Sequence, residues 1–162
     1  HYPLRRQRQM CIRDRYNSSM LKRTLLQGMK ALVQCTWGLP QTILGLALFL
    51  RYTKAPHALY RGCIQTQWPR GGGISLGLFF FTADAVHAPS AERRAALAAH
   101  EYGHTLQSLL LGPLYLLTIG VISFTWANAP RFKRMRRERG LPYSHCIVER
   151  WADRLGGIRD QK

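Results

Sequence analysis

The sequence predicts a mainly α-helical membrane protein with a small β-hairpin. Three observations support this fold class. Ala31–Leu50 holds twenty residues without a charge, which is the length that a membrane-spanning helix needs. A second apolar run covers Leu109–Ala127. Between the two runs, stretches rich in strand-forming residues stand on either side of a glycine-rich turn. With 162 residues, the chain is expected to form one compact domain.

Residues 1–19 are expected to be a non-native leader. Met10–Arg15, with the sequence MCIRDR, is similar to the translated end of a transposon-derived sequencing adapter. Met20 would then be the native start. The formal net charge of the whole chain is +16, and the chain stays strongly basic without these residues. A genuine basic leader is the alternative interpretation.

Residues 20–50 are predicted to form a basic stretch followed by a membrane anchor helix. Lys22, Arg23 and Lys30 precede the apolar run, as in a signal anchor. The sequence Gly38-Leu39-Pro40 interrupts the run and weakens this prediction, because proline does not continue a helix. A buried core helix is the alternative.

A β-hairpin is predicted over residues 59–82. Leu59–Trp68 and Ile74–Thr82 are the two strands, and Pro69–Gly73 is the turn between them. The glycine run lacks the Lys-Ser/Thr pair of a phosphate-binding loop, which excludes that class of nucleotide site. The hairpin is expected to be structural, although a sheet edge can also pair with an extended peptide.

Residues 90–111 are predicted to form one helix that carries His100-Glu101-Tyr102-Gly103-His104, an HExxH pattern. Ser90 is the expected N-cap, and Gly112-Pro113 ends the helix. Two histidines four residues apart lie on the same face of a helix and can bind one zinc ion. The glutamate between them can act as a general base. The alternative is a solvated helix with two surface histidines.

A third metal ligand is expected from a second helix over residues 146–156. Glu149 and Asp153 are four residues apart and therefore share a helix face. Glu149 is the candidate ligand, and Asp153 could accept the second ring N–H of a ligand histidine. His145 is the substitute if Glu149 does not bind. An ordinary charged helix is the alternative interpretation of the segment.

The motifs HEYGH at 100–104 and ERWAD at 149–153 together resemble the gluzincin-type integral-membrane zinc metallopeptidases. The resemblance is closest to the CaaX prenyl-protein peptidases and the heat-shock membrane peptidases, although this chain is much shorter. It implies a zincin-like domain over 51–162, with an active-site helix plus a second ligand helix. It also implies residue roles: Zn²⁺ ligands His100, His104 and Glu149, general base Glu101, and Asp153 as partner of a ligand histidine. HEYGHTLQSLLLGPLYLLTIG is also similar to a group of small bacterial membrane proteins.

The apolar segment 109–127 is predicted to be a re-entrant or interfacial hairpin. A full crossing would place the HExxH motif and Glu149 on opposite sides of the membrane. Only fourteen uncharged residues lie between Pro113 and Asn128, which is short for a membrane-spanning helix. The rival interpretation is a true membrane span and no zinc site.

A basic loop is predicted over 131–139. It packs six basic residues into nine positions: Arg131, Lys133, Arg134, Arg136, Arg137 and Arg139. Such a cluster beside an apolar segment indicates the cytoplasmic side and contact with anionic lipid headgroups. Nucleic-acid binding ranks lower, because Phe132 is the only aromatic residue in the cluster and no nucleic-acid motif surrounds it.

The sequence therefore predicts a membrane-associated zinc metallopeptidase of the bacterial inner membrane, with its active site on the cytoplasmic side. It would hydrolyse peptide bonds with a zinc-activated water and Glu101 as base. The cysteines form no CxxC pair, which suits a reducing compartment. The expected partners are an unidentified peptide or protein substrate and the membrane. The alternative is a non-catalytic membrane scaffold or assembly protein, with or without structural zinc.

Overall fold

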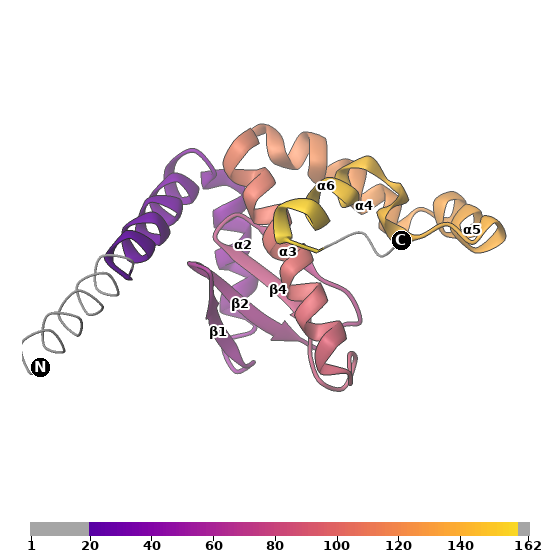
Figure 1. The fold of residues 1–162 in the computed structure, drawn as a ribbon, viewed down its shortest axis with the longest axis horizontal. Coiled ribbons are helices and arrows are strands. Elements are labelled where there is room, and N and C mark those ends of the chain that lie inside the picture. The colour runs from indigo at the N-terminus through magenta and orange to yellow at the C-terminus, as the bar shows by residue number, and fades with distance from the viewer. Residues whose placement is uncertain (1–19, 159–162) are drawn as a thin grey trace, which may run out of the picture.

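A four-stranded mixed sheet with helices on both faces forms the centre of the protein (Figure 1). The computed structural model describes residues 20–158, so the expectation that 1–19 are a non-native leader lies outside the described residues. After a first helix, Met20–Thr36, the order is α2 (Leu39–Arg51), β1 (His57–Tyr60), β2 (Cys63–Trp68), β3 (Ile74–Leu76), β4 (Phe79–Ala83), α3 (Ala91–Leu111), the π-helix η1 (Leu116–Gly120), α4 (Val121–Asn128), α5 (Pro130–Arg139), the 3₁₀-helix η2 (Tyr143–His145) and α6 (Ile147–Gly156).

The predicted β-hairpin over 59–82 is wrong, because two tight turns cut its strands into four. The strand order is β1-β2-β4-β3, with β2 and β4 parallel and the outer pairs antiparallel. Arg61 and Gly62 both have positive φ, as the commonest two-residue hairpin turn requires. Gly77, with φ of 63°, opens the second turn. Residues 69–73 therefore connect β2 to the edge strand β3, which pairs with β4 and not with β2.

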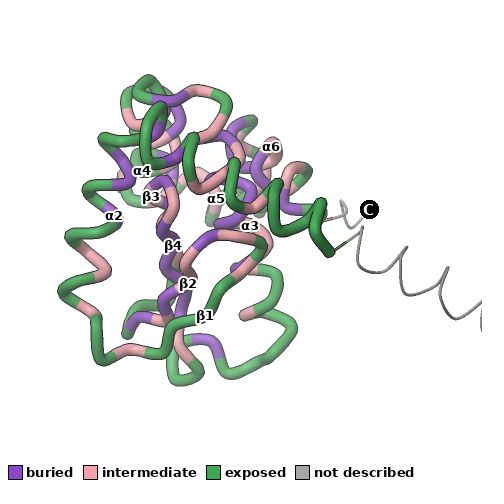
Figure 2. The backbone as a smooth tube through the Cα atoms, turned by 90° about the vertical axis from the view of Figure 1, so that its left-hand side faces the viewer, coloured by how far each residue is buried: buried purple, intermediate pink, exposed green. Residues whose placement is uncertain are grey.

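The sheet separates α2 from α3. Phe79 and Phe81 pack towards α2, whereas Phe80 packs against α3 beside Tyr102. All five residues of β4 are buried, which explains why three phenylalanines follow one another in it, since a strand covered on both faces has no solvent-exposed side. Figure 2 shows the buried residues gathered on β2, β4 and the inner helices, while most of α5 is exposed.

The predicted membrane anchor over 20–50 is not one helix. The Gly38-Leu39-Pro40 break divides it into Met20–Thr36 and α2, whose axes are bent by 97°, because the proline begins a new helix. Within residues 20–158, none of the single helices combines the length and apolar character needed to cross a membrane, and only this bent pair meets both criteria together. The predicted fold class, a mainly α-helical membrane protein with a small hairpin, is therefore wrong.

Two buried glutamines hold this bend against α3. Gln34 Nε2 donates to the carbonyl oxygen of Thr105 at 2.9 Å, and Gln34 Oε1 accepts from Ser108 Oγ at 3.1 Å. Gln41 Nε2 donates to Ser108 Oγ at 2.8 Å and to the Gly112 carbonyl oxygen at 2.9 Å. Amides inside an apolar helix pair therefore contact the helix that carries the HExxH motif.

Helix α3 ends at Gly112 as predicted, whereas the basic segment further along the chain differs from the prediction. The segment 109–127 is broken at Gly112, whose φ is 53°, and continues as η1 and α4. Residues 131–139 belong to α5 and are not a loop, because arginine, lysine, glutamate and methionine are good helix formers. Pro130 begins that helix, and Gly140 ends it in the left-handed conformation.

Candidate metal centre

Helix α3 carries both histidines of the HExxH motif to the face opposite the sheet contact of Tyr102. Ser90 caps the helix by accepting a hydrogen bond from the Arg93 backbone N–H at 3.3 Å. The two imidazole rings are 4.8 Å apart between centroids, one helical turn from each other. Both side chains are largely withdrawn from water: the exposed fractions are 13% for His100 and 6% for His104.

Helix α6 approaches α3 so closely that small residues are required at the contact. A Cβ atom at Gly103 would collide with the Ala152 carbonyl oxygen, and one at Gly156 would collide with that of Ala99. This approach brings Glu149 against the two histidines, and its side chain is fully buried. The sequence spacing thus places a carboxylate from one helix over two imidazoles from another.

Three side-chain atoms meet at one point. Glu149 Oε2 lies 3.0 Å from His100 Nε2 and 3.3 Å from His104 Nε2. Two ligands of one tetrahedral zinc ion, each bound at about 2.0–2.1 Å, lie about 3.3 Å apart. His100, His104 and Glu149 therefore form a group that could hold a metal ion.

The outer nitrogen of each imidazole faces an acceptor. His100 Nδ1 lies 2.7 Å from Asp153 Oδ1, and His104 Nδ1 lies 2.7 Å from Gln107 Oε1. The Gln107 amide is oriented by its Nε2, which donates to the Val148 carbonyl oxygen at 2.8 Å. Each Nδ1 therefore carries a proton. With neutral rings, both Nε2 lone pairs point at a carboxylate oxygen, so either a metal ion or a proton on an Nε2 must lie between them.

Electrostatics at the meeting point favour positive charge. Burial lowers the pKa of His100, but its hydrogen bonds to Asp153 and Glu149 outweigh burial and raise that pKa to about 10. Burial raises the pKa of Glu149, but hydrogen bonds from both histidines outweigh it and lower that pKa to about 2. Glu149 Oε1 is buried and has no hydrogen-bond partner within the described residues. The donor set, one open carboxylate oxygen included, suits a metal ion.

Glu101 lies beside the meeting point and is not part of it. Its carboxylate is buried, and burial raises its pKa above the ordinary value. Ser75 Oγ, on the edge strand β3, lies 3.0 Å from Glu101 Oε2 and 2.5 Å from the Glu101 carbonyl oxygen. A Cβ atom at Gly73 would collide with the Glu101 side chain, so the β2–β3 loop lies directly against it. The environment makes Glu101 a stronger base than an exposed glutamate.

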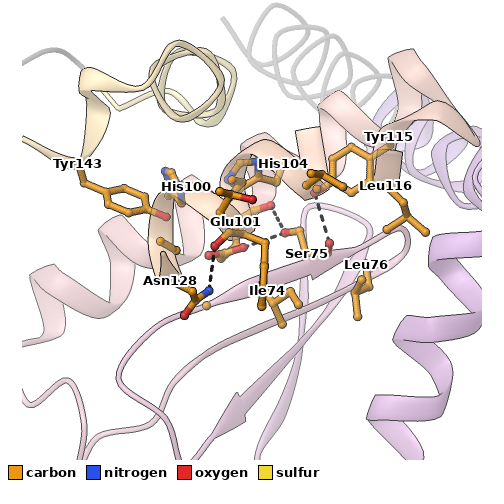
Figure 3. Close-up of a pocket in the computed structure, with 17 residues that line it drawn as sticks. Ile74, Ser75, Leu76, His100, Glu101, His104, Tyr115, Leu116, Asn128 and Tyr143 are labelled. Carbon is orange, nitrogen blue, oxygen red and sulfur yellow. Dashed lines mark hydrogen bonds between the residues drawn. The ribbon is translucent and has the colours of Figure 1, made fainter. Parts of the chain in front are cut away.

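A cavity of about 380 Å³ opens next to these side chains. His100, Glu101 and His104 line it from α3, and Tyr143 lines it from η2 (Figure 3). The Tyr143 ring lies 6.1 Å from the His100 ring and points towards the pocket. Burial and the nearby carboxylates raise the pKa of the Tyr143 hydroxyl, which therefore stays protonated as a hydrogen-bond donor.

The structure separates the other candidate residues from this centre. The His145 ring stacks on Trp126 at 6.4 Å, and His145 does not belong to the metal-binding group. The six basic residues of 131–139 all lie on α5, outside the lining of the cavity.

Sequence analysis missed Gln107 and Ser75. Gln107 follows His104 by three residues, so the helical repeat that selected the histidines also places it on their face. Ser75 could not be found in this way, because its contact with Glu101 depends on the position of β3 at the sheet edge. Neither the glutamine nor the serine belongs to a sequence motif that would single it out.

Comparisons with protein-family models, with curated proteins and with solved structures found no match to this chain.

Proposed function

We propose that the protein is a zinc-dependent peptidase. The observation that carries this proposal is the convergence of His100 Nε2, His104 Nε2 and one Glu149 oxygen, with both Nδ1 atoms occupied by acceptors. A structural zinc site usually has four protein ligands, whereas a catalytic one has three and an open position. Three ligands beside an open cavity and a buried glutamate favour catalysis over a purely structural metal.

Zinc held by these side chains would polarise a substrate carbonyl and lower the pKa of a water in the open position. Glu101 supplies the base: its buried carboxylate accepts the proton of the attacking water and then donates it to the leaving amine. Ser75 fixes one Glu101 oxygen, which leaves the other for the proton. Asp153 and Gln107 keep both imidazoles in the Nδ1–H tautomer.

Tyr143 is the side chain placed to stabilise the developing oxyanion. It lines the same cavity as His100 and Glu101, and its raised pKa keeps the hydroxyl a donor. A donor aimed at charge that appears only in the transition state accelerates the reaction without strengthening ground-state binding.

We also propose that the protein works at an anionic membrane surface. Trp37, at the bend before α2, packs on Gly112, and exposed apolar side chains continue from there. We call this set the apolar rim: Trp37, Leu39, Leu110, Leu114 and Leu117. Helix α5, at the other end of the molecule from this bend (Figure 1), carries six basic residues. Exposed apolar side chains and clustered arginine and lysine residues are the two features that bind a protein to anionic lipid.

Metal content and cleavage of peptides test the peptidase proposal together. We expect about one zinc per wild-type chain and its loss in His104→Ala and Glu149→Ala. Glu101→Gln should keep the zinc and lose the cleavage of a mixed peptide pool. Cleavage that is unchanged in Glu101→Gln would refute the mechanism. A folded wild type without zinc affinity would refute the metal centre.

A further inference from the structure

Two cavities meet at His100 and Glu101. The 380 Å³ cavity described above extends towards η1 and α4, whereas a second cavity of about 790 Å³ extends towards the β2–β3 loop and the start of α3. His100, Glu101 and Tyr143 line both of them. A peptide that passes the candidate metal centre therefore has one end in each cavity.

The first cavity, which we call the apolar cavity, has an apolar wall. Leu76, Leu116 and Val121 line it together with Phe124. None of the arginines and lysines within residues 20–158 lines it. Its size and lining suit one large apolar side chain of a substrate.

The second cavity, which we call the arginine cavity, carries two cationic side chains. Arg70 comes from the loop after β2, and Arg93 comes from α3. The Arg70 guanidinium lies over the Trp68 ring at 5.1 Å. Trp68 Nε1 in turn donates to the Gly72 carbonyl oxygen at 2.8 Å, which ties the ring to the same loop. Arg70 is therefore held in position before any ligand arrives.

Arg93 stands on the metal-binding side of α3. It precedes His100 by seven residues, which is two helical turns and about 10 Å along the axis. An extended peptide advances about 3.3 Å per residue. A group at Arg93 would thus lie about three residues from the bond at the metal centre.

Neither arginine has a carboxylate partner within residues 20–158, where the ion pairs involve other side chains. The acidic residues that line the arginine cavity are Glu101 and Asp153. The Glu101 carboxylate accepts a hydrogen bond from the Ser75 hydroxyl, and the Asp153 carboxylate is hydrogen-bonded to the His100 ring. The two guanidinium groups are therefore available to an anion from outside, and their planar donors suit a carboxylate.

We propose that the substrate is a peptide with an acidic group, held by Arg70 and Arg93, about three residues from the scissile bond. Its large apolar side chain occupies the apolar cavity on the other side of that bond. The inference rests on the proposed peptidase function and adds the substrate class. The acidic group is the side chain of an aspartate or a glutamate within the peptide.

The test is a cleavage map of a defined pool of synthetic peptides, read by mass spectrometry for the zinc-loaded full chain. The wild type should cut next to large apolar residues, with acidic groups enriched on the opposite side. A matched pair, one cleaved peptide and its Asp/Glu→Gln version, then gives relative kcat/KM values. Arg70→Gln and Arg93→Gln should each reduce the preference for the acidic peptide roughly tenfold. The control is Arg51→Gln, an exposed arginine at the end of α2.

Binding of the same pair to the Glu101→Gln variant, by fluorescence anisotropy, gives a readout that does not need turnover. Tighter binding of the acidic peptide, lost with either arginine, supports the proposal. Cleavage without acidic enrichment refutes the substrate class and leaves the peptidase intact. No cleavage and no binding refute both. An equal loss for the acidic and the neutral peptide shows that the arginines act on the fold, which also refutes the anion site.

Discussion

His104 Nδ1 is hydrogen-bonded to Gln107 Oε1 at 2.7 Å, one turn along the same helix. His100 has the equivalent bond to Asp153, which belongs to a different helix. The two histidines of the candidate metal centre are thus oriented by partners of different charge and from different parts of the chain. Partners of this kind fix the tautomer of a ligand and its orientation.

Replacing Gln107 should weaken zinc binding without removing a ligand. In Gln107→Leu, His104 loses the acceptor for its Nδ1–H, and we expect the zinc affinity to fall about 10- to 100-fold. Competition with a chromophoric chelator measures this change. Gln65→Leu is the control, since Gln65 also donates from a part-buried amide, to Thr82 Oγ1 at 2.9 Å, away from the site. Equal zinc affinity in the wild type and Gln107→Leu would contradict the role.

A methyl group at Gly103 should separate the two ligand helices. Gly103→Ala places a Cβ against the Ala152 carbonyl oxygen, and such overpacking costs about 1–3 kcal/mol. We expect a lower unfolding midpoint and loss of zinc, because Glu149 moves with α6. The matched substitution Gly28→Ala, at a helical glycine with no atom within 4 Å, should leave both unchanged or raise stability slightly. Retained zinc in Gly103→Ala would mean that α6 does not have to approach α3 so closely.

The Tyr143 hydroxyl should matter for turnover alone. Tyr143→Phe keeps the ring against His100 and removes the donor, so kcat should fall about 100-fold with zinc content and KM nearly unchanged. Steady-state kinetics on a peptide from the cleavage map measures kcat and KM separately. Tyr60→Phe, whose ring packs beside Phe80 in the sheet core, serves as the control. A rise in KM at constant kcat would make Tyr143 a binding residue.

Attachment to lipid should depend on the charge of α5. Arg134, Arg137 and Arg139 are exposed, and their joint replacement by glutamine should weaken binding to vesicles with anionic lipid by about 1 kcal/mol per residue. Flotation with the wild type should weaken with salt and fail with uncharged vesicles. Arg136 stays in place because it bonds the Trp126 carbonyl oxygen. Equal flotation of the triple variant would show that the basic helix does not contact lipid.

The chemistry of the centre is more local in sequence than the fold that surrounds it. His100 and His104 on one helix, and Glu149 and Asp153 on another, are each four residues apart, so the helical repeat selects them, and the HExxH pattern adds Glu101. The strand order is not local. The β2–β4 pairing depends on two turns of two residues each and on a crossover to the sheet edge. Apolar composition also misled the prediction, since it does not distinguish a membrane anchor from two short helices packed at an angle.

The bend between the first two helices also fixes the rotation of the helix that bears the histidines. Purely apolar contacts would tolerate a small turn of α3 about its axis, because dispersion forces have little direction. The Gln34 and Gln41 amides bind the Thr105 and Gly112 carbonyl oxygens, and such bonds weaken steeply when the angle changes. The two helices on either side of the bend thus restrict rotation of α3 about its own axis. They keep both imidazoles directed at α6. A change at the bend would therefore rotate α3 about its axis and move both imidazoles relative to Glu149.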